Sequence, residues 1–169
     1  MSDKPKRNLT MTLALSGMMA ALIFVATLCF KLPMPMTNGY VHLGDGFILL
    51  AASLLGWAAV PAAAIGSMLS DLLLGYVPYA LPTFIIKAAV AAVAVLSLRS
   101  SREWLRVLGL IVAEALMVGG YFVVEWLLLG YGLAAATASV LGNCMQALSG
   151  VVAGLLLIPL CQRIKPRLR

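Results

Sequence analysis

Four ionisable residues, Asp45, Asp71, Lys87 and Glu125, lie in or at the edges of long apolar segments. A bilayer disfavours such groups by several kcal/mol, so they are rarely placed there without a function. The opposite charges of Lys87 and Glu125 would let these residues pair with each other or share a ligand. We therefore interpret the four residues as a binding site for a small hydrophilic molecule. The alternative is a structural role, in which a buried ion pair and helix-capping carboxylates hold the helices together.

The composition places the chain among integral membrane proteins. Its 169 residues are 63% hydrophobic and 11% charged, and a mean hydropathy of +1.04 is too high for a soluble domain with a polar surface. The net charge of +6 does not indicate a nucleic-acid partner, because the basic residues lie at the ends of apolar runs, where orientation and anionic lipid account for them. The cysteines lack metal-ligand spacing and are interpreted as small buried hydrophobic residues: Cys29, Cys144 and Cys161.

The apolar runs predict an all-α integral membrane protein, a six-transmembrane-helix bundle in a single domain, 1–169. The helices would cover residues 9–30, 46–58, 62–75, 82–98, 105–129 and 137–161. The segment 46–75 is too long for one ordinary helix and short for two. If it holds two, ten of the twelve basic residues fall on one side of the membrane; if it holds one, those ten divide three against seven. The positive-inside rule therefore favours six helices in the cell membrane, with both termini cytoplasmic.

Three connecting segments would face the outside: 31–45, 75–81 and 130–136. They are rich in Tyr, Pro, Gly and Asn, a composition that suits a lid. When residues are counted along each helix from its outer end, polar residues of five helices lie at a similar depth in the membrane. We therefore predict a substrate-binding site made of Tyr40, His42, Asp45, Asp71, Tyr76, Tyr79, Lys87, Glu125, Asn143 and Gln146.

Some of these residues have a second interpretation. His42, the only histidine, is either a ligand or lid contact or a solvated interfacial residue, and without a second ligand at helical spacing it does not predict a metal site. Asp45 precedes Gly46 and could cap the helix that starts there. Glu114 lies about three turns before Glu125 on the same helix face, as either a protonated structural carboxyl or part of the site. We expect no metal ion and no cofactor.

Small residues line one side of the first predicted helix. Ser16 with Ala20, and Gly17 with Ala21, form two overlapping pairs at a spacing of four residues, which lets another helix approach closely. That helix belongs either to a partner subunit or to this same bundle. The sequence contains no Walker A loop, catalytic triad or metal motif, so an energy source would have to reside in another chain.

Three segments, together with the six helices and the small residues of the first one, resemble a known family. They are GYVHLGD at 39–45, GSMLSDLLLGY at 66–76, and PTFIIK at 82–87. The chain resembles the substrate-binding S component of energy-coupling factor (ECF) vitamin transporters, and is closest to the branch with riboflavin and hydroxymethylpyrimidine S components. The resemblance implies capture of a vitamin on the outer side. It also implies that the small-residue face of the first helix docks on a transmembrane coupling subunit that carries two ATPases.

The predicted function is therefore that of a high-affinity substrate-binding subunit, without catalytic activity, of an ATP-driven importer for a vitamin or vitamin precursor. The alternative is a self-contained proton- or sodium-coupled secondary transporter, in which Asp71, Lys87, Glu114 and Glu125 relay protons; the chain has few helices for a typical paired-repeat carrier. An intramembrane enzyme is disfavoured by the lack of a nucleophile and base pair. The sequence does not specify the vitamin, because a site of mixed charge can accept a carboxylate, a ring nitrogen or hydroxyl groups.

Overall fold

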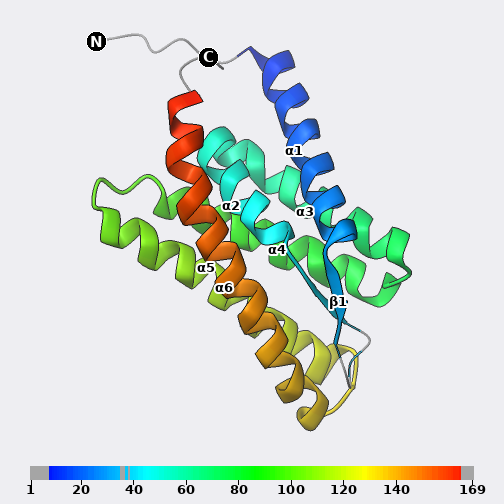
Figure 1. The fold of residues 1–169 in the computed structure, drawn as a ribbon. Coiled ribbons are helices and arrows are strands. Elements are labelled where there is room, and N and C mark those ends of the chain that lie inside the picture. The colour runs from blue at the N-terminus through cyan, green and yellow to red at the C-terminus, as the bar shows by residue number, and fades with distance from the viewer. Residues whose placement is uncertain (1–7, 35–36, 38, 165–169) are drawn as a thin grey trace.

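The computed structural model describes residues 8–34, 37 and 39–164, with a helical backbone but no described side chains over 161–164. Six α-helices and one short β-ribbon follow one another along the chain (Figure 1). Their bounds are α1 Leu9–Cys29, β1 Lys31–Pro33, β2 Tyr40–His42, α2 Gly44–Leu55, α3 Ala59–Leu74, α4 Val77–Ser97, α5 Glu103–Val123 and α6 Leu133–Ile164. The start of α1 and the end of α6 lie at the same end of the bundle (Figure 1).

Five helical stretches in the described part of the chain are long and apolar enough to cross a membrane, with Gly44–Leu74 counted as one. That stretch is broken: a 3-10 turn, Gly56–Ala58, separates α2 from α3, and Gly56 has a φ of 61°. Figure 1 shows that α3 runs in a different direction from α2. The predicted break between the second and third helices, at 59–61, is therefore displaced to 56–58. Pro61 lies in the first turn of α3, where a helix needs no backbone donor.

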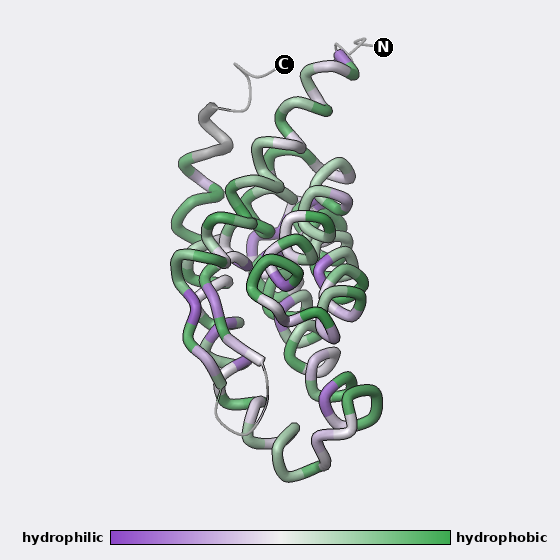
Figure 2. The backbone as a smooth tube through the Cα atoms, turned by 90° about the vertical axis from the view of Figure 1, so that its right-hand side faces the viewer, coloured by the Kyte–Doolittle hydropathy of each residue, from purple (hydrophilic) through white to green (hydrophobic). Residues whose placement is uncertain are grey.

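Helix α2 forms the centre of the bundle. It packs against α1, α3, α4 and α6, and none of its large hydrophobic residues is exposed. Its sequence is apolar around nearly its whole circumference, which is typical of a buried helix. The remaining helices carry exposed Leu, Ile, Val or Trp side chains, and hydrophobic residues predominate along most of the chain (Figure 2). The bundle is thus apolar on the outside as well as in the core, as a bilayer requires.

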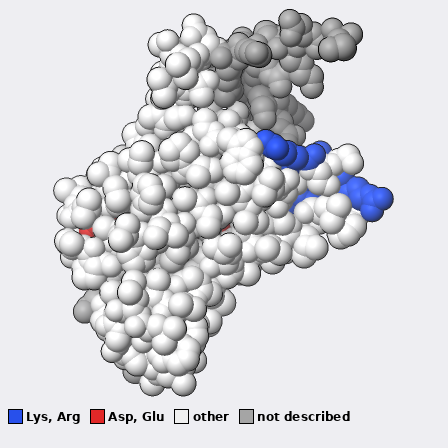
Figure 3. Space-filling model, turned by 180° about the vertical axis from the view of Figure 1, so that it is seen from behind, with Lys and Arg blue, Asp and Glu red and all other residues white. Residues whose placement is uncertain are grey.

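The sequence predicts positions for the cysteines and for the basic residues, and the structure describes only some of these residues. Cys29 and Cys144 are exposed rather than buried, because they lie on outward faces of the bundle, and the side chain of Cys161 lies outside the described residues. The basic side chains visible in Figure 3 gather in one part of a largely uncharged face. The remaining basic residues of the predicted cytoplasmic clusters also lie outside the described side chains: Lys4, Lys6, Arg7, Arg163, Lys165, Arg167 and Arg169.

Two of the predicted outer segments are more ordered than expected. The segment 31–45 contains an antiparallel ribbon in which Lys31 pairs with His42 and Pro33 with Tyr40, so the protein is not purely α-helical. The predicted loop 75–81 is wrong: α3 ends at Leu74 and is capped by Gly75, which has a φ of 82°, and α4 begins at Val77. Proline in a first helical turn needs no hydrogen-bond partner, so Pro78 is compatible with this early start.

Candidate ligand-binding site

A small cavity lies where the β-ribbon meets α3, α4, α5 and α6. Its volume of about 20 Å³ leaves room for about one water molecule. The lining side chains come from residues that are far apart in the sequence: Met34, Gly39, Tyr40, His42, Asp71, Tyr79, Thr83, Tyr121, Glu125 and Asn143. The ribbon and the residues beside it supply four of these ten, and so the ribbon covers the cavity on one side.

Asp71 is the first of two acidic residues in the cavity wall. It lies near the end of α3, and only 3% of its surface is exposed. The Tyr40 hydroxyl donates a hydrogen bond of 2.7 Å to Asp71 Oδ1. Burial, followed by the charge of Asp71, raises the pKa of Tyr40, which keeps this phenol protonated as a donor. Asp71 Oδ2 has no hydrogen-bond partner within the described part of the chain.

Glu125 is the second acidic residue. It lies in a π-helical turn, Val124–Leu128, that follows α5, and π-turns inside helices are frequent at functional sites. The Tyr79 hydroxyl donates a hydrogen bond of 3.1 Å to Glu125 Oε1, and the Ser139 hydroxyl donates to Oε2. Both carboxyl oxygens therefore have a partner, although the residue is 1% exposed and contributes to the cavity wall.

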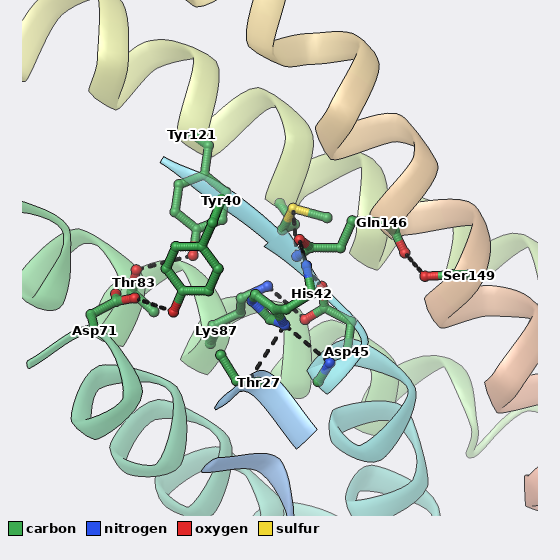
Figure 4. A network of polar contacts seen from close by, with 12 residues as sticks. Thr27, Tyr40, His42, Asp45, Asp71, Thr83, Lys87, Tyr121, Gln146 and Ser149 are labelled. Atoms are coloured by element: carbon green, nitrogen blue, oxygen red, sulfur yellow. Dashed lines mark hydrogen bonds and ion pairs between the residues drawn. The ribbon is translucent and has the colours of Figure 1, made fainter. Parts of the chain in front are cut away.

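Lys87 belongs to a separate group beside the cavity. Its ammonium nitrogen forms a 2.6 Å ion pair with Asp45 Oδ1, and Gln146 Nε2 donates a 2.5 Å hydrogen bond to Asp45 Oδ2. The backbone N–H of His42 donates to Gln146 Oε1 at 2.8 Å, as Figure 4 shows. The proposed pairing of Lys87 with Glu125 is therefore wrong, because the central helix α2 brings Asp45 to Lys87. Asp45 is also not an N-cap: Leu43 holds that position, and the carboxylate of Asp45 is directed to Lys87.

His42 lies between this group and the cavity. Its ring Nδ1 accepts a 3.0 Å hydrogen bond from the backbone N–H of Gly44 and lies 3.4 Å from the Thr27 hydroxyl. Burial, followed by the charge of Lys87, lowers the pKa of His42 to about 4. The imidazole is therefore neutral at pH 7 and adds no positive charge to the site. Among the described residues, no group of three His, Cys, Asp or Glu side chains lies close enough to hold a metal ion.

The five tyrosines of the chain form one connected cluster of rings. The ring centroids of Tyr40 and Tyr76 are 4.6 Å apart, and Tyr79 lies 6.4 to 6.5 Å from Tyr76, Tyr121 and Tyr131. Lys87 Nζ lies 5.5 Å from the centroid of the Tyr121 ring, on the side of the ion pair. The cavity wall thus combines aromatic rings with the carboxyl groups of Asp71 and Glu125.

The structure divides the predicted site residues into two sets. Six line the cavity: Tyr40, His42, Asp71, Tyr79, Glu125 and Asn143. Three form the Lys87 group, namely Asp45, Lys87 and Gln146. Tyr76 belongs to neither set, and its ring packs against that of Tyr40. Asn143 is 3% exposed, and its Nδ2 has no hydrogen-bond partner within the described residues. Two unpartnered atoms, Asp71 Oδ2 and Asn143 Nδ2, therefore belong to side chains of the same cavity wall.

Sequence reasoning missed Thr83 and Tyr121, whose hydroxyl groups lie 3.0 Å apart. Helical spacing could have found both, because residues four positions apart share a helix face. Thr83 precedes Lys87 by four residues, and Tyr121 precedes Glu125 by four. Met34 and Gly39 carried no comparable signal, because the ribbon's fold against the bundle decides their position.

Glu114 is buried in α5 at 1% exposure, and neither carboxyl oxygen has a hydrogen-bond partner within the described part of the chain. It does not line the cavity. Instead it borders a groove between α5 and α6 that is otherwise formed mainly by apolar side chains.

The small residues of α1 point in two directions. Ser16 and Ala20 are partly buried; the Ser16 hydroxyl lies 3.4 Å from the Ala58 carbonyl, and a Cβ at Gly66 would lie 2.5 Å from the Ala20 carbonyl oxygen. Gly17 and Ala21 are exposed, and a Cβ at Gly17 would have no neighbour within 4 Å. The first pair packs on α3 and its preceding turn, while the second pair lies on a free face.

Comparison with known proteins decides the family. Residues 7–163 match the model of the family described as "ECF-type riboflavin transporter, S component". The chain belongs to this family. It is therefore the S component, or substrate-binding subunit, of an ECF-type transporter, which is a membrane transport protein. The resemblance inferred from the three sequence segments is confirmed.

The chain is also similar to one curated relative and to one solved structure. A Pyrococcus woesei protein, described as "Uncharacterized protein in gap 3'region", is 32% identical over 134 residues, covering 78% of this chain and 88% of that protein. The fold matches a solved structure of the S component of a bacterial ECF transporter with a TM-score of 0.70 and 21% identity, covering 96% of this chain and 99% of the other. At this identity the match supports the fold alone.

Proposed function

We propose that this S component captures a small water-soluble vitamin or vitamin precursor on the outer side of the cell membrane and delivers it for ATP-driven import. The observation that carries the proposal is the pair of buried, unpartnered atoms in the cavity wall, Asp71 Oδ2 and Asn143 Nδ2. A buried polar atom without a partner is costly. A ligand that supplies one acceptor and one donor removes this cost for both atoms.

The β-ribbon is the proposed lid. A cavity of about 20 Å³ is far smaller than an ordinary ligand pocket of about 300 Å³ or more, so a vitamin enters only when part of the wall moves. The ribbon is short, and next to it Met34 packs against Gly142 of α6, where a Cβ would collide with the Met34 sulfur. Opening the cavity requires the ribbon to give up this contact together with the hydrogen bonds from Tyr40 to Asp71 and from His42 to Gln146.

We also propose that α2 and α3 cross the membrane separately, which makes six crossings and puts both termini in the cytoplasm. The direction change at Gly56 and the exposed Arg102 between α4 and α5 support this topology. In a background with Cys29→Ser, Cys144→Ser and Cys161→Ser, the Arg102→Cys variant should resist an impermeant thiol reagent in intact cells. Rapid labelling from outside would contradict the topology.

Partner docking is assigned to the free face of α1. Gly17 and Ala21 are exposed, and small residues at this spacing favour close helix contact. We propose that the transmembrane coupling subunit of an ECF module with two ATPases packs here. Gly17→Leu with Ala21→Leu should abolish ATP-dependent uptake by the reconstituted complex, while the isolated protein still binds ligand. The control is Ser16→Ala, because Ser16 faces the bundle.

The same reconstitution tests the whole proposal. Wild-type protein in liposomes with the ECF module should accumulate vitamin only when ATP is supplied. Accumulation by the protein alone on an imposed proton or sodium gradient would overturn the proposal and establish a secondary transporter.

A further inference from the structure

The acidic groups inside the protein outnumber the basic ones. Among the described side chains, four acids are buried, Asp45, Asp71, Glu114 and Glu125, and they are accompanied by one buried lysine. Lys87 is committed to Asp45 through the 2.6 Å ion pair. No described Lys or Arg lines the cavity, whereas Asp71 and Glu125 both do. An ionised carboxylate in such a place is costly without a positive partner.

The remaining wall also favours a positive charge. Tyr40, Tyr79 and Tyr121 line the cavity, and Tyr76 and Tyr131 extend the same cluster of rings. Faces of aromatic rings attract cations, and cages of such rings are a common means of binding charged nitrogen groups. His42, which also lines the cavity, is neutral at pH 7, because burial lowers its pKa to about 4. It therefore does not oppose a cation.

We infer that, within the proposed function, this site takes a vitamin-sized planar nitrogen heterocycle that carries a positive charge. The charged ring would lie among the tyrosines, with a donor directed to Asp71 Oδ2 and an acceptor to Asn143 Nδ2, the two atoms that lack partners. Glu125 supplies the second negative charge from the opposite helix, held in place by Tyr79 and Ser139. A neutral or anionic ligand would leave both acids without a counter-charge.

Binding to purified wild-type protein in nanodiscs tests this inference with six probes of known charge at pH 7. Thiamine and 1-methylnicotinamide are cations, riboflavin and nicotinamide are neutral, and pantothenate and nicotinate are anions. 1-Methylnicotinamide and nicotinamide share a ring and a carboxamide, so they isolate the effect of the charge. We expect a cation to bind most tightly. 1-Methylnicotinamide should bind about tenfold or more tighter than nicotinamide, because only its methylated ring carries a positive charge for the acids and the tyrosine faces.

The outcomes separate the two levels of the proposal. Tightest binding of a neutral or anionic probe, or no binding of either cation, would overturn the inference and leave the proposed function standing. The proposed function fails separately, if the protein alone accumulates substrate on an imposed ion gradient in the liposome assay. Asp71→Asn and Glu125→Gln should each reduce the preference for the cation about tenfold, while Glu103→Gln, at an exposed acid, should not. An equal loss for charged and neutral probes would also overturn the inference. The wild-type comparison decides the question even where a variant does not fold.

Discussion

Two polar regions lie side by side in this bundle, and they differ in how completely their atoms are paired. In the Lys87 group, both oxygens of Asp45 are used, one by the Lys87 ammonium and one by the Gln146 amide. In the cavity wall, Asp71 Oδ2 and Asn143 Nδ2 have no partner within the described residues. Both regions are almost fully buried, so exposure does not explain the difference.

The comparison shows that a buried charge is not by itself a sign of ligand binding. A group such as that of Lys87 and Asp45, whose hydrogen-bonding atoms already have partners, holds α2 against α4 and contributes to the stability of the folded protein. An unsaturated wall retains hydrogen-bonding capacity that a ligand can use. The Lys87 group therefore fits the structural alternative considered for the charged residues, while the cavity wall fits the binding hypothesis.

The largest effect is expected when the ion pair of the Lys87 group is broken. Lys87→Ala leaves Asp45 buried without its cation, and removal of one partner of a buried pair typically costs about 3–5 kcal/mol. Thermal or denaturant unfolding in detergent should show this loss. Lys87→Met with Asp45→Asn removes both charges and should recover most of the stability. Unchanged stability of Lys87→Ala, together with lost ligand affinity, would move the pair into the binding site.

His42 lies between the two regions and should make the stability of the protein depend on pH. The folded-state pKa lies near 4, below the ordinary value of 6.5, so protonation favours the unfolded chain. The contribution is present above pH 6.5 and is lost as pH falls toward 4, with a slope of about 1.4 kcal/mol per pH unit between those values. His42→Asn should remove this part of the slope when unfolding is measured at several pH values. An identical slope in the variant would contradict a buried neutral imidazole.

A smaller effect is expected where the lid meets α6. Gly142→Val would place a side chain against Met34 and Val41, and overpacking of this kind costs about 1–3 kcal/mol. The closed lid should be destabilised, so that ligand dissociates about tenfold faster or more in a stopped-flow or surface-based assay. Gly119→Val is the matched control, because a Cβ at Gly119 has no neighbour within 4 Å. Equal dissociation rates in the two variants would remove the lid from the mechanism.

The smallest effect sharpens the cavity side of the comparison. Tyr79→Phe removes one of the two side-chain donors to Glu125 and should weaken ligand binding by about 1 kcal/mol, a typical value for one hydrogen bond. Titration calorimetry can resolve this change. Tyr76→Phe is the control, because Tyr76 does not line the cavity. An effect of the same size in both variants would indicate a general loss of ring packing.

Much of the architecture could be predicted from local patterns. Apolar runs define membrane helices because the hydrocarbon core accepts only segments whose backbone groups are paired internally. Segments 39–45, 66–76 and 82–87 identified the family. What failed were mainly features set by contacts between distant residues: the β-ribbon next to α1, the partner of Lys87, and the exposure of Cys29 and Cys144. The helical start at Val77 was missed although Gly75 and Pro78 mark it locally.

The sequence by itself determined that this protein is an apolar helical bundle with polar residues at the ends of several helices, because composition and hydrophobic length are local properties of the chain. Only the tertiary structure decided which of these residues meet. Asp45 reaches Lys87 because α2 is the central helix, while Glu125 is turned into the cavity wall by a π-helical turn. In the same way, α3 covers Ser16 and Ala20 and leaves Gly17 and Ala21 free. Spacing in one helix specifies a face, but only the neighbouring helices specify what that face contacts.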